Sequence, residues 1–145
     1  MAKALGDALV AMHHIGSTSV PGIVAKPVID MLAVVTRVKA TDLRTPALAA
    51  LGYEAMGEFG IRGRRYFRKS SADGARTHQI HAFAVDSCEI RRHLAFRDYL
   101  RAHSAAAEEY GKLKLELARR FPTDVEAYTE AKTEFIRAIE SRVLS

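Results

Sequence analysis

Apolar residues are spaced differently in the two halves of the chain, and the spacing predicts strands first and helices afterwards. A nearly unbroken apolar and β-branched run, PVIDMLAVV, fills positions 27–35. Such a run is typical of a central strand that is buried on both faces. A shorter strand is predicted at 12–15. Residues 2–10 repeat apolar positions at i, i+3 and i+4, which predicts a short helix.

Two further segments predict a β-hairpin. RRYFRK at 64–69 and THQIHAFA at 77–84 are joined by a segment that contains Ala72-Asp73-Gly74. A turn sequence of this kind between two strand-like runs favours antiparallel pairing of the two strands.

The rest of the pattern is helical, with one helix between the strands and about three after Ser87. The expected helix starts carry capping residues, namely Thr45 followed by Pro46, Ser87, Ser104, and the pair Thr123 and Glu126 as a capping box. This order predicts a single α+β domain over residues 1–145. We expect a mixed β-sheet from the N-terminal half and a C-terminal group of about three helices against one side or end of it.

Composition agrees with one globular domain. The 145 residues are 48% hydrophobic and 27% charged, which allows a core and argues against disorder. No apolar run approaches the roughly 20 residues that cross a bilayer, and the N-terminal segment lacks the features of a secretory signal. The single Cys88 cannot form an internal disulfide, as expected in a reducing compartment. We therefore expect a cytoplasmic protein without a membrane partner.

Positive charge is concentrated in the first half. The net charge is +5, and residues 1–86 carry 11 Lys and Arg against 7 Asp and Glu, whereas residues 87–145 carry 11 against 10. A positive field of this kind attracts an anionic ligand to the first half. Nonspecific nucleic-acid binding ranks lowest among the explanations, because few aromatic residues interleave the basic hairpin and the helical half is nearly neutral.

Asp30 is a carboxylate inside the most apolar strand. At period two its neighbours on the same face are Val28, Leu32 and Val34. A lone carboxylate buried there is unfavourable unless a cation, a metal or hydrogen-bond donors compensate it. Asp30 therefore either accepts hydrogen bonds from a neighbouring loop or binds a metal ion or a substrate hydroxyl.

The loop GSTSVPG at 16–22, just before this strand, has the composition of an anion-binding turn. Its backbone N–H groups and hydroxyls can surround phosphate oxygens, although most turns of this composition are only turns. The candidate phosphate-binding residues are Gly16, Ser17, Thr18 and Ser19. Twelve residues separate the Gly-Ser pair from Asp30. This spacing resembles the nucleotidyltransferase signature, in which Gly-Ser holds the triphosphate and strand carboxylates hold Mg²⁺.

Eight segments, in the same order throughout, resemble the GrpB family. They are HIGSTSVPG at 14–22, AKPVID at 25–30, LGYE at 51–54, GRRYFRK at 63–69, THQIH at 77–81, HLAFRDYLR at 93–101, YGKLK at 110–114 and YTEAKTEFI at 128–136. The resemblance runs from about residue 12 to the C-terminus. It implies a fold of the nucleotidyltransferase superfamily, with a divalent cation (Mg²⁺ or Mn²⁺) as cofactor and a nucleoside triphosphate as substrate. It indicates a fold more firmly than a reaction.

The chain departs from that pattern in two places. The superfamily has a second acid two residues after the first, and Leu32 occupies that position here. Loss of one carboxylate should weaken two-metal catalysis, because two ions share their carboxylate ligands. Family members also begin with a longer segment that carries a Trp-containing helix, whereas this chain has no Trp. We therefore expect a shortened N-terminal helix.

His81 is the candidate that could replace the missing acid. The resemblance implies a third strand ligand near this position, and His81 is therefore expected to assist Asp30 as a catalytic and metal-binding partner. Imidazole suits Mn²⁺ or Zn²⁺ better than Mg²⁺. The alternative is that His81 is an ordinary hydrogen-bonded residue of the sheet. Lys26, in the AKPVID segment, is a further candidate for phosphate binding.

Three other cations are candidates for neutralising phosphate charge. Arg65 lies in the basic hairpin, where alternation places Arg64 on the opposite face. Lys114 and Lys132 interrupt apolar helical stripes instead of polar faces. The hairpin arginines could instead be solvated, and the two lysines could extend outward into solvent.

Two functions fit these residues. The first is metal-dependent transfer of a nucleotidyl group to an unknown small acceptor. The second is a nucleotide- or phosphate-binding module of the same fold that has lost turnover, an alternative that Leu32 favours.

Overall fold

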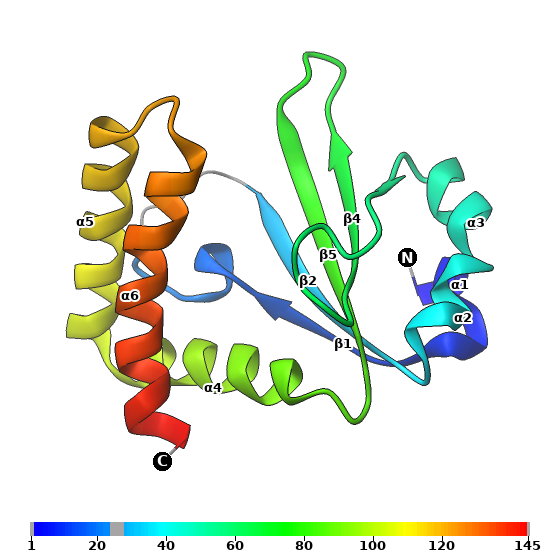
Figure 1. The fold of residues 1–145 in the computed structure, drawn as a ribbon, viewed down its shortest axis with the longest axis horizontal. Helices are drawn as coiled ribbons and strands as arrows, with labels where there is room; N and C mark the ends of the chain where they lie inside the picture. The colour runs from blue at the N-terminus through cyan, green and yellow to red at the C-terminus, as the bar shows by residue number, and fades with distance from the viewer. Residues whose placement is uncertain (1, 24–27, 145) are drawn as a thin grey trace.

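Five strands form one mixed sheet in the order β1-β2-β5-β4-β3 (Figure 1). The computed structural model describes residues 2–23 and 28–144. The strands are β1 (Leu9–Ile15), β2 (Ile29–Val35), β3 (Glu54–Ala55), β4 (Arg65–Ser70) and β5 (Arg76–Ala84). β2 pairs with β5 in parallel, and all other neighbours are antiparallel. The predicted mixed sheet is therefore confirmed.

Helices cover the two faces of this sheet separately. They are α1 (Ala2–Leu5), α2 (Val38–Asp42), α3 (Thr45–Ala50), α4 (Cys88–Ala102), α5 (Ser104–Arg120) and α6 (Val125–Leu144), with short 3-10 turns η1 (Gly6–Ala8) and η2 (Ser17–Ser19). Figure 1 shows α1, α2 and α3 on one side of the sheet and α4, α5 and α6 on the other. The predicted C-terminal group of three helices is confirmed.

Successive residues along each strand point to opposite faces of the sheet, so the core is divided into separate clusters on the two faces. Leu5, Leu48, Phe67 and Ile80 belong to the core cluster under α1 and α3. The opposite face carries a smaller cluster of Ile15, Leu32 and Phe83, against which the α4 residues Ile90 and Leu94 pack. A third cluster joins α4, α5 and α6 to one another and includes Val20 after η2. Asp30 and His81 are therefore on the face that looks toward α4, α5 and α6.

The N-terminal helix is shorter than the sequence predicts. The expected helix over 2–10 ends at Leu5, and Leu9 already begins β1. Gly6 adopts φ +55°, a left-handed conformation that ends a helix and is favourable only for glycine. The apolar residues that would continue the helical repeat lie instead in η1 and at the start of β1.

Three of the four predicted caps differ from the structure. Thr45 is the first residue of α3, whose cap position is Arg44 with no side-chain hydrogen bond. Ser87 caps α4 as expected, because its side chain accepts a hydrogen bond from the backbone N–H of Glu89. α6 begins at Val125 instead, and Asp124 accepts the hydrogen bond from the backbone N–H of Ala127 at 3.0 Å. Ser104 is the first residue of α5, and no side-chain hydrogen bond caps that helix. Asp is as good a cap as Thr, so sequence alone does not choose between neighbouring candidates.

No helix within the described ranges, 2–23 and 28–144, is both long and apolar enough to cross a membrane.

Candidate functional site at the Gly16 turn and Asp30

The Gly-Ser turn and Asp30 lie against each other. Ile15, the last residue of β1, pairs with Asp30 in the antiparallel register of β1 and β2. Gly16 follows with φ +75°, and a Cβ atom on Gly16 would lie 2.6 Å from Oδ2 of Asp30. Only glycine combines this backbone conformation with so close an approach. The turn and the carboxylate that the sequence assigns to one candidate site are therefore in contact.

Hydrogen bonds to the sheet and to α4 fix the turn. The Ser19 hydroxyl donates to the Gly16 carbonyl at 2.5 Å, and the Thr18 hydroxyl donates to the Val28 carbonyl at 3.3 Å. Arg101 of α4 donates from Nε to the Ser19 carbonyl at 2.9 Å. Two of the three hydroxyls of the turn thus use their protons within the protein. The backbone N–H of Ser19 also donates within the turn, to the Gly16 carbonyl at 3.0 Å. In this arrangement Thr18 and Ser19 therefore have no hydroxyl proton to offer a ligand, and Ser19 has no backbone proton to offer either.

His81 forms a bridge between an arginine and Asp30. Arg64 donates from Nη1 to Nδ1 of His81 at 3.2 Å, and Nε2 of His81 lies 3.3 Å from Oδ1 of Asp30. Because a guanidinium group can only donate, Nδ1 is assigned as the acceptor and Nε2 carries the proton. His81 then donates to Asp30 and holds its carboxylate in place. A metal ion at Nε2 would have to displace that proton, so the geometry favours His81 as a positioning residue.

Arg64 is the main anchor of this bridge, and sequence reasoning missed it. Its Nε donates to the Glu58 carbonyl at 3.1 Å and its Nη2 to the Phe59 carbonyl at 2.7 Å. Only 6% of Arg64 is exposed, and this burial lowers the pKa of its guanidinium. The residue therefore ties the loop between β3 and β4 to His81.

The structure does not bring Arg65 to this site. Arg65 lies on the opposite face of β4, where its Nε pairs with Oδ1 of Asp42 at 3.0 Å. Sequence alternation correctly separates Arg64 from Arg65, but it does not say which face meets Asp30. The register of β4 and β5 decides which arginine shares the face of Asp30. Tyr66 pairs with His81, so Arg64, two residues before Tyr66, lies on the face of His81, whereas Arg65 pairs with Ala82 on the other face.

Lys114 and Lys132 both belong to helices that face Asp30. Nζ of Lys114, on α5, donates a hydrogen bond to Oγ of Ser17. Lys132, on α6, is partly buried. Burial lowers its pKa, and the negative charge of Asp30 acts in the opposite direction. Burial raises the pKa of Tyr110 on α5, and the negative charge of Asp30 adds to this increase. The field of Asp30 therefore reaches both helices, and the two lysines interrupt their apolar stripes where they approach the site.

The expected second acid is missing from the site. Arg64 reaches Asp30 only through His81, Lys114 donates to Ser17, and the charge of Asp30 acts on Lys132. Leu32, at the expected position of a second acid, is fully buried at 0% exposure. Among residues 2–23 and 28–144, no group of three or more His, Cys, Asp or Glu side chains could hold a metal by itself. Lys26, predicted from sequence to contact phosphate, lies outside the described residues.

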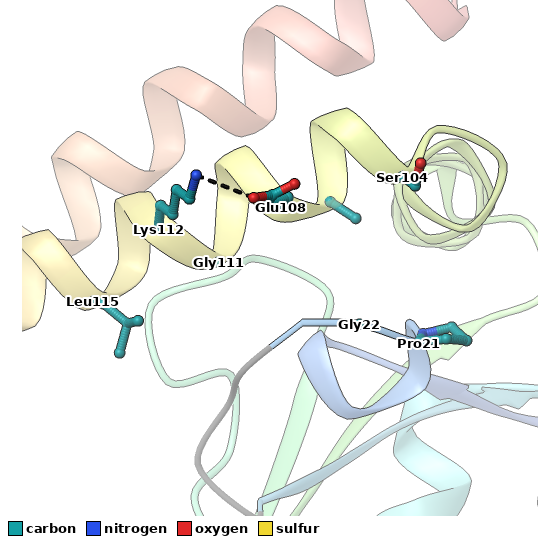
Figure 2. Close-up of a pocket in the computed structure, with 8 residues that line it drawn as sticks. Pro21, Gly22, Ser104, Glu108, Gly111, Lys112 and Leu115 are labelled. Carbon is teal, nitrogen blue, oxygen red and sulfur yellow. Dashed lines mark ion pairs between the residues drawn. The ribbon is translucent and has the colours of Figure 1, made fainter.

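A separate groove lies beyond the end of the turn, between Pro21-Gly22 and α5 (Figure 2). Its volume is about 530 Å³, and its lining residues are Pro21, Gly22, Ser104, Ala107, Glu108, Gly111, Lys112 and Leu115. Lys112 and Glu108 form an ion pair at 3.1 Å across one turn of the helix. The lining contains neither Asp30 nor Ser17, so the groove is distinct from the candidate site, and sequence reasoning did not predict it.

Comparisons with known proteins agree with the sequence resemblance. The family model described as GrpB protein matches residues 1–142. YqkA of Bacillus subtilis is 45% identical over 93% of this chain and 39% of its own length, and PA4798 of Pseudomonas aeruginosa is 38% identical over 94% and 56%. The glutamate-rich protein GrpB of Alkalihalophilus pseudofirmus is 32% identical over 93% of this chain and 79% of its own length. The chain thus spans well under two thirds of the first two relatives.

A solved structure shares the whole fold. The crystal structure of the conserved protein GrpB from Enterococcus faecalis is 44% identical and superposes with a TM-score of 0.89. The match covers 99% of this chain and 85% of that one. This likeness supports the α+β architecture that the order of strands and helices predicts.

Proposed function

The chain belongs to the GrpB family, and on that premise we propose that the site at Gly16 and Asp30 binds the phosphate groups of a nucleotide together with one divalent cation. The observation that carries the proposal is the meeting of three elements at one place. Asp30 packs against Gly16, Lys114 donates to Ser17 of the same turn, and Lys132 lies within the field of Asp30.

The charge balance favours a polyanionic ligand. Lys132 brings a positive charge into a partly buried position beside the site, where the charge of Asp30 acts on it. A partly buried ammonium without a matching anion is unfavourable, and the lowered pKa of Lys132 expresses that cost. Phosphate oxygens would neutralise Lys132, and the start of the turn would add backbone N–H donors.

One carboxylate is enough for a metal that arrives with its ligand. Mg²⁺ usually keeps several waters and binds through one or two carboxylates plus substrate phosphates. Asp30 would supply the protein oxygen for Mg²⁺ or Mn²⁺, while His81 keeps that carboxylate oriented through its Nε2–H. Asp30 would hold the cation, and the cation would supply positive charge to neutralise the phosphates.

Nucleotidyl transfer is the second candidate, and the contact between the Gly-Ser turn and Asp30 favours it. In such a reaction an acceptor hydroxyl loses its proton to solvent and its oxygen attacks the α-phosphorus. The bond from that phosphorus to the bridging oxygen breaks, and pyrophosphate leaves; a divalent cation held by Asp30 would neutralise the developing charge. Leu32 offers no second carboxylate for another ion. Binding without turnover is therefore the function that the geometry supports better.

A nucleotide and metal screen on the purified protein tests both candidates. Saturating nucleoside triphosphate with Mg²⁺ or Mn²⁺ is expected to raise the melting temperature by about 5–10 °C, as expected for ligand at about 100 times its Kd. A pyrophosphate assay with candidate acceptors separates transfer from binding. The proposal fails if neither a nucleotide nor inorganic tripolyphosphate, with or without metal, shifts the transition. The variant Arg65→Met, which removes a cation from the opposite face, serves as the control and should respond like the wild type.

A further inference from the structure

Four rings stand in a row that leads from the site to the surface. Phe59 stacks on Tyr66 with centroids 5.2 Å apart and planes at 20°. Tyr66 lies 5.4 Å from His81, and His81 lies 6.2 Å from His93, each pair with planes at 33°. The row joins the loop after β3, the strands β4 and β5, and α4. His81, inside the row, is the residue that bonds to Asp30.

Phe59 is the outer end of this row and is held in an unusual conformation. It is the only non-glycine residue with positive φ, at +48°, among the described residues 2–23 and 28–144. A bulky side chain in this region of φ and ψ is disfavoured. Phe59 is nevertheless 54% exposed, so burial of the residue does not compensate for the conformation. The loop thus holds an aromatic ring toward solvent at the flank of the site.

Arg64 connects this ring to the site directly. The same guanidinium group donates to the Phe59 carbonyl at 2.7 Å and to Nδ1 of His81 at 3.2 Å. It also lies over the Tyr66 ring, 4.8 Å from its centroid. The backbone of Phe59 is therefore separated from Asp30 by only two side chains, Arg64 and His81.

A second arginine borders the exposed ring. The guanidinium carbon of Arg68 lies 5.8 Å from the Phe59 centroid, and its Nε pairs with Oε2 of Glu54 at 3.3 Å. An accessible aromatic ring bordered by arginine is the surface on which proteins stack nucleobases, because every base has a π face.

We propose that Phe59 is the base-stacking platform of this site. The proposal rests on the proposed function and adds where the base lies: the phosphates bind at Ser17, Lys114 and Lys132, and the base stacks on the exposed part of the Phe59 ring. Stacking recognises any planar base, so the platform predicts tolerance of base identity, with purines favoured modestly over pyrimidines by their larger rings.

Titration calorimetry on the full chain in Mg²⁺ separates this platform from the phosphate site. The ligands are ATP, CTP and inorganic tripolyphosphate, which has the phosphates but no base. We expect ATP to bind the wild type about 10-fold tighter than tripolyphosphate. Phe59→Leu should abolish that advantage and leave tripolyphosphate affinity unchanged. Phe59→Trp, which keeps an aromatic face, should retain it and controls for a general disturbance of the loop.

Each other outcome contradicts the platform in a recognisable way. Equal affinity of wild-type protein for ATP and tripolyphosphate would leave the phosphate site intact and overturn the platform. Equal weakening of both ligands by Phe59→Leu would show that the ring only supports the loop. Tight binding of oligo(dT), lost in Phe59→Leu while ATP binding is unchanged, would assign the ring to single-stranded nucleic acid. Absence of binding by all ligands would refute the proposed function itself.

Discussion

Asparagine in place of Asp30 is expected to remove the metal-dependent part of nucleotide binding, a loss of about 100-fold in affinity for the Mg²⁺ or Mn²⁺ complex. The amide has the same shape, and its oxygen can still accept the hydrogen bond from Nε2 of His81, so the fold should be unchanged. Only the charge that a cation needs is removed. Titration calorimetry with ATP, in the presence of Mg²⁺ and in the presence of EDTA, measures the effect.

The metal-free measurement gives this variant an internal control. Asp30 repels phosphate when no cation is bound, so its neutralisation should leave ATP affinity in EDTA unchanged or raise it. A role of Asp30 that is purely structural predicts the opposite, a fall in both conditions with a lower melting temperature. An unchanged affinity in Mg²⁺ would show that the cation, if any, binds elsewhere.

Methionine in place of Lys132 is expected to weaken phosphate binding and to stabilise the free protein at the same time. The partly buried ammonium is unfavourable without an anion, and its replacement by an apolar chain of similar length should raise the free energy of unfolding by about 1 kcal/mol at pH 7. Nucleotide affinity should fall about 10-fold or more, because a charge-assisted contact to phosphate is lost. Chemical denaturation measures the gain, and calorimetry measures the loss.

The pH dependence of stability follows from the lowered pKa of Lys132. The folded protein releases the proton below the ordinary value of 10.5, so the unfolded chain binds more protons between the two values. Stability due to this group therefore rises as the pH increases through that window. The difference between wild type and Lys132→Met should accordingly shrink toward pH 10. Comparing the two proteins largely cancels the opposite trend from the raised pKa values of Tyr110 and Tyr128.

Lys112→Met is the matched control for this variant. Lys112 is exposed on α5, where it pairs with Glu108 at 3.1 Å. Such a surface pair contributes little to stability, so the control should change neither unfolding nor nucleotide affinity appreciably. If Lys132→Met destabilises the protein, or leaves affinity at the level of Lys112→Met, Lys132 is not a phosphate-binding residue.

The sequence was sufficient to predict four of the five strands and the neighbourhood of the turn and Asp30, but not the short strand β3 or the strand order. The apolar run that becomes β2 and the turn-separated segments that become β4 and β5 have local signals strong enough to define strands. Asp30 stood out because its strand neighbours are apolar, and the glycine and serine before the strand lay at the right distance. The antiparallel pairing of Ile15 with Asp30 then brings the turn to the carboxylate.

What the sequence could not give was the side of the sheet on which each hairpin residue lies. Alternation separates Arg64 from Arg65, but only packing decides which one is buried under the loop. A register shift between Lys69 and Ser70 also redirects Arg76, whose Nη1 reaches the Tyr66 hydroxyl at 3.3 Å. Bulges of this kind re-aim side chains and have no reliable local signature.

Tertiary contacts also explain why the sequence does not predict a role for Phe59 or His93. Phe59 belongs to none of the family-like segments, and His93 begins one of them without any chemistry being implied for it. Each acquires its place in the row of rings only when loop, strands and α4 meet. The two lysines were found because they interrupt apolar stripes, yet the sequence left open whether they extend outward. The hydrogen bond from Lys114 to Ser17 shows that this lysine turns inward.

The most direct test of the site is where a paramagnetic cation binds. In the ¹⁵N–¹H spectrum of the full chain, Mn²⁺ added with ATP should broaden the backbone amide signals of Gly16, Ser17, Asp30 and His81. Signals from α3, on the other side of the sheet, should remain sharp. Broadening confined to the groove at Glu108 and Lys112, or equal for all exposed residues, would contradict a cation and nucleotide site at Asp30.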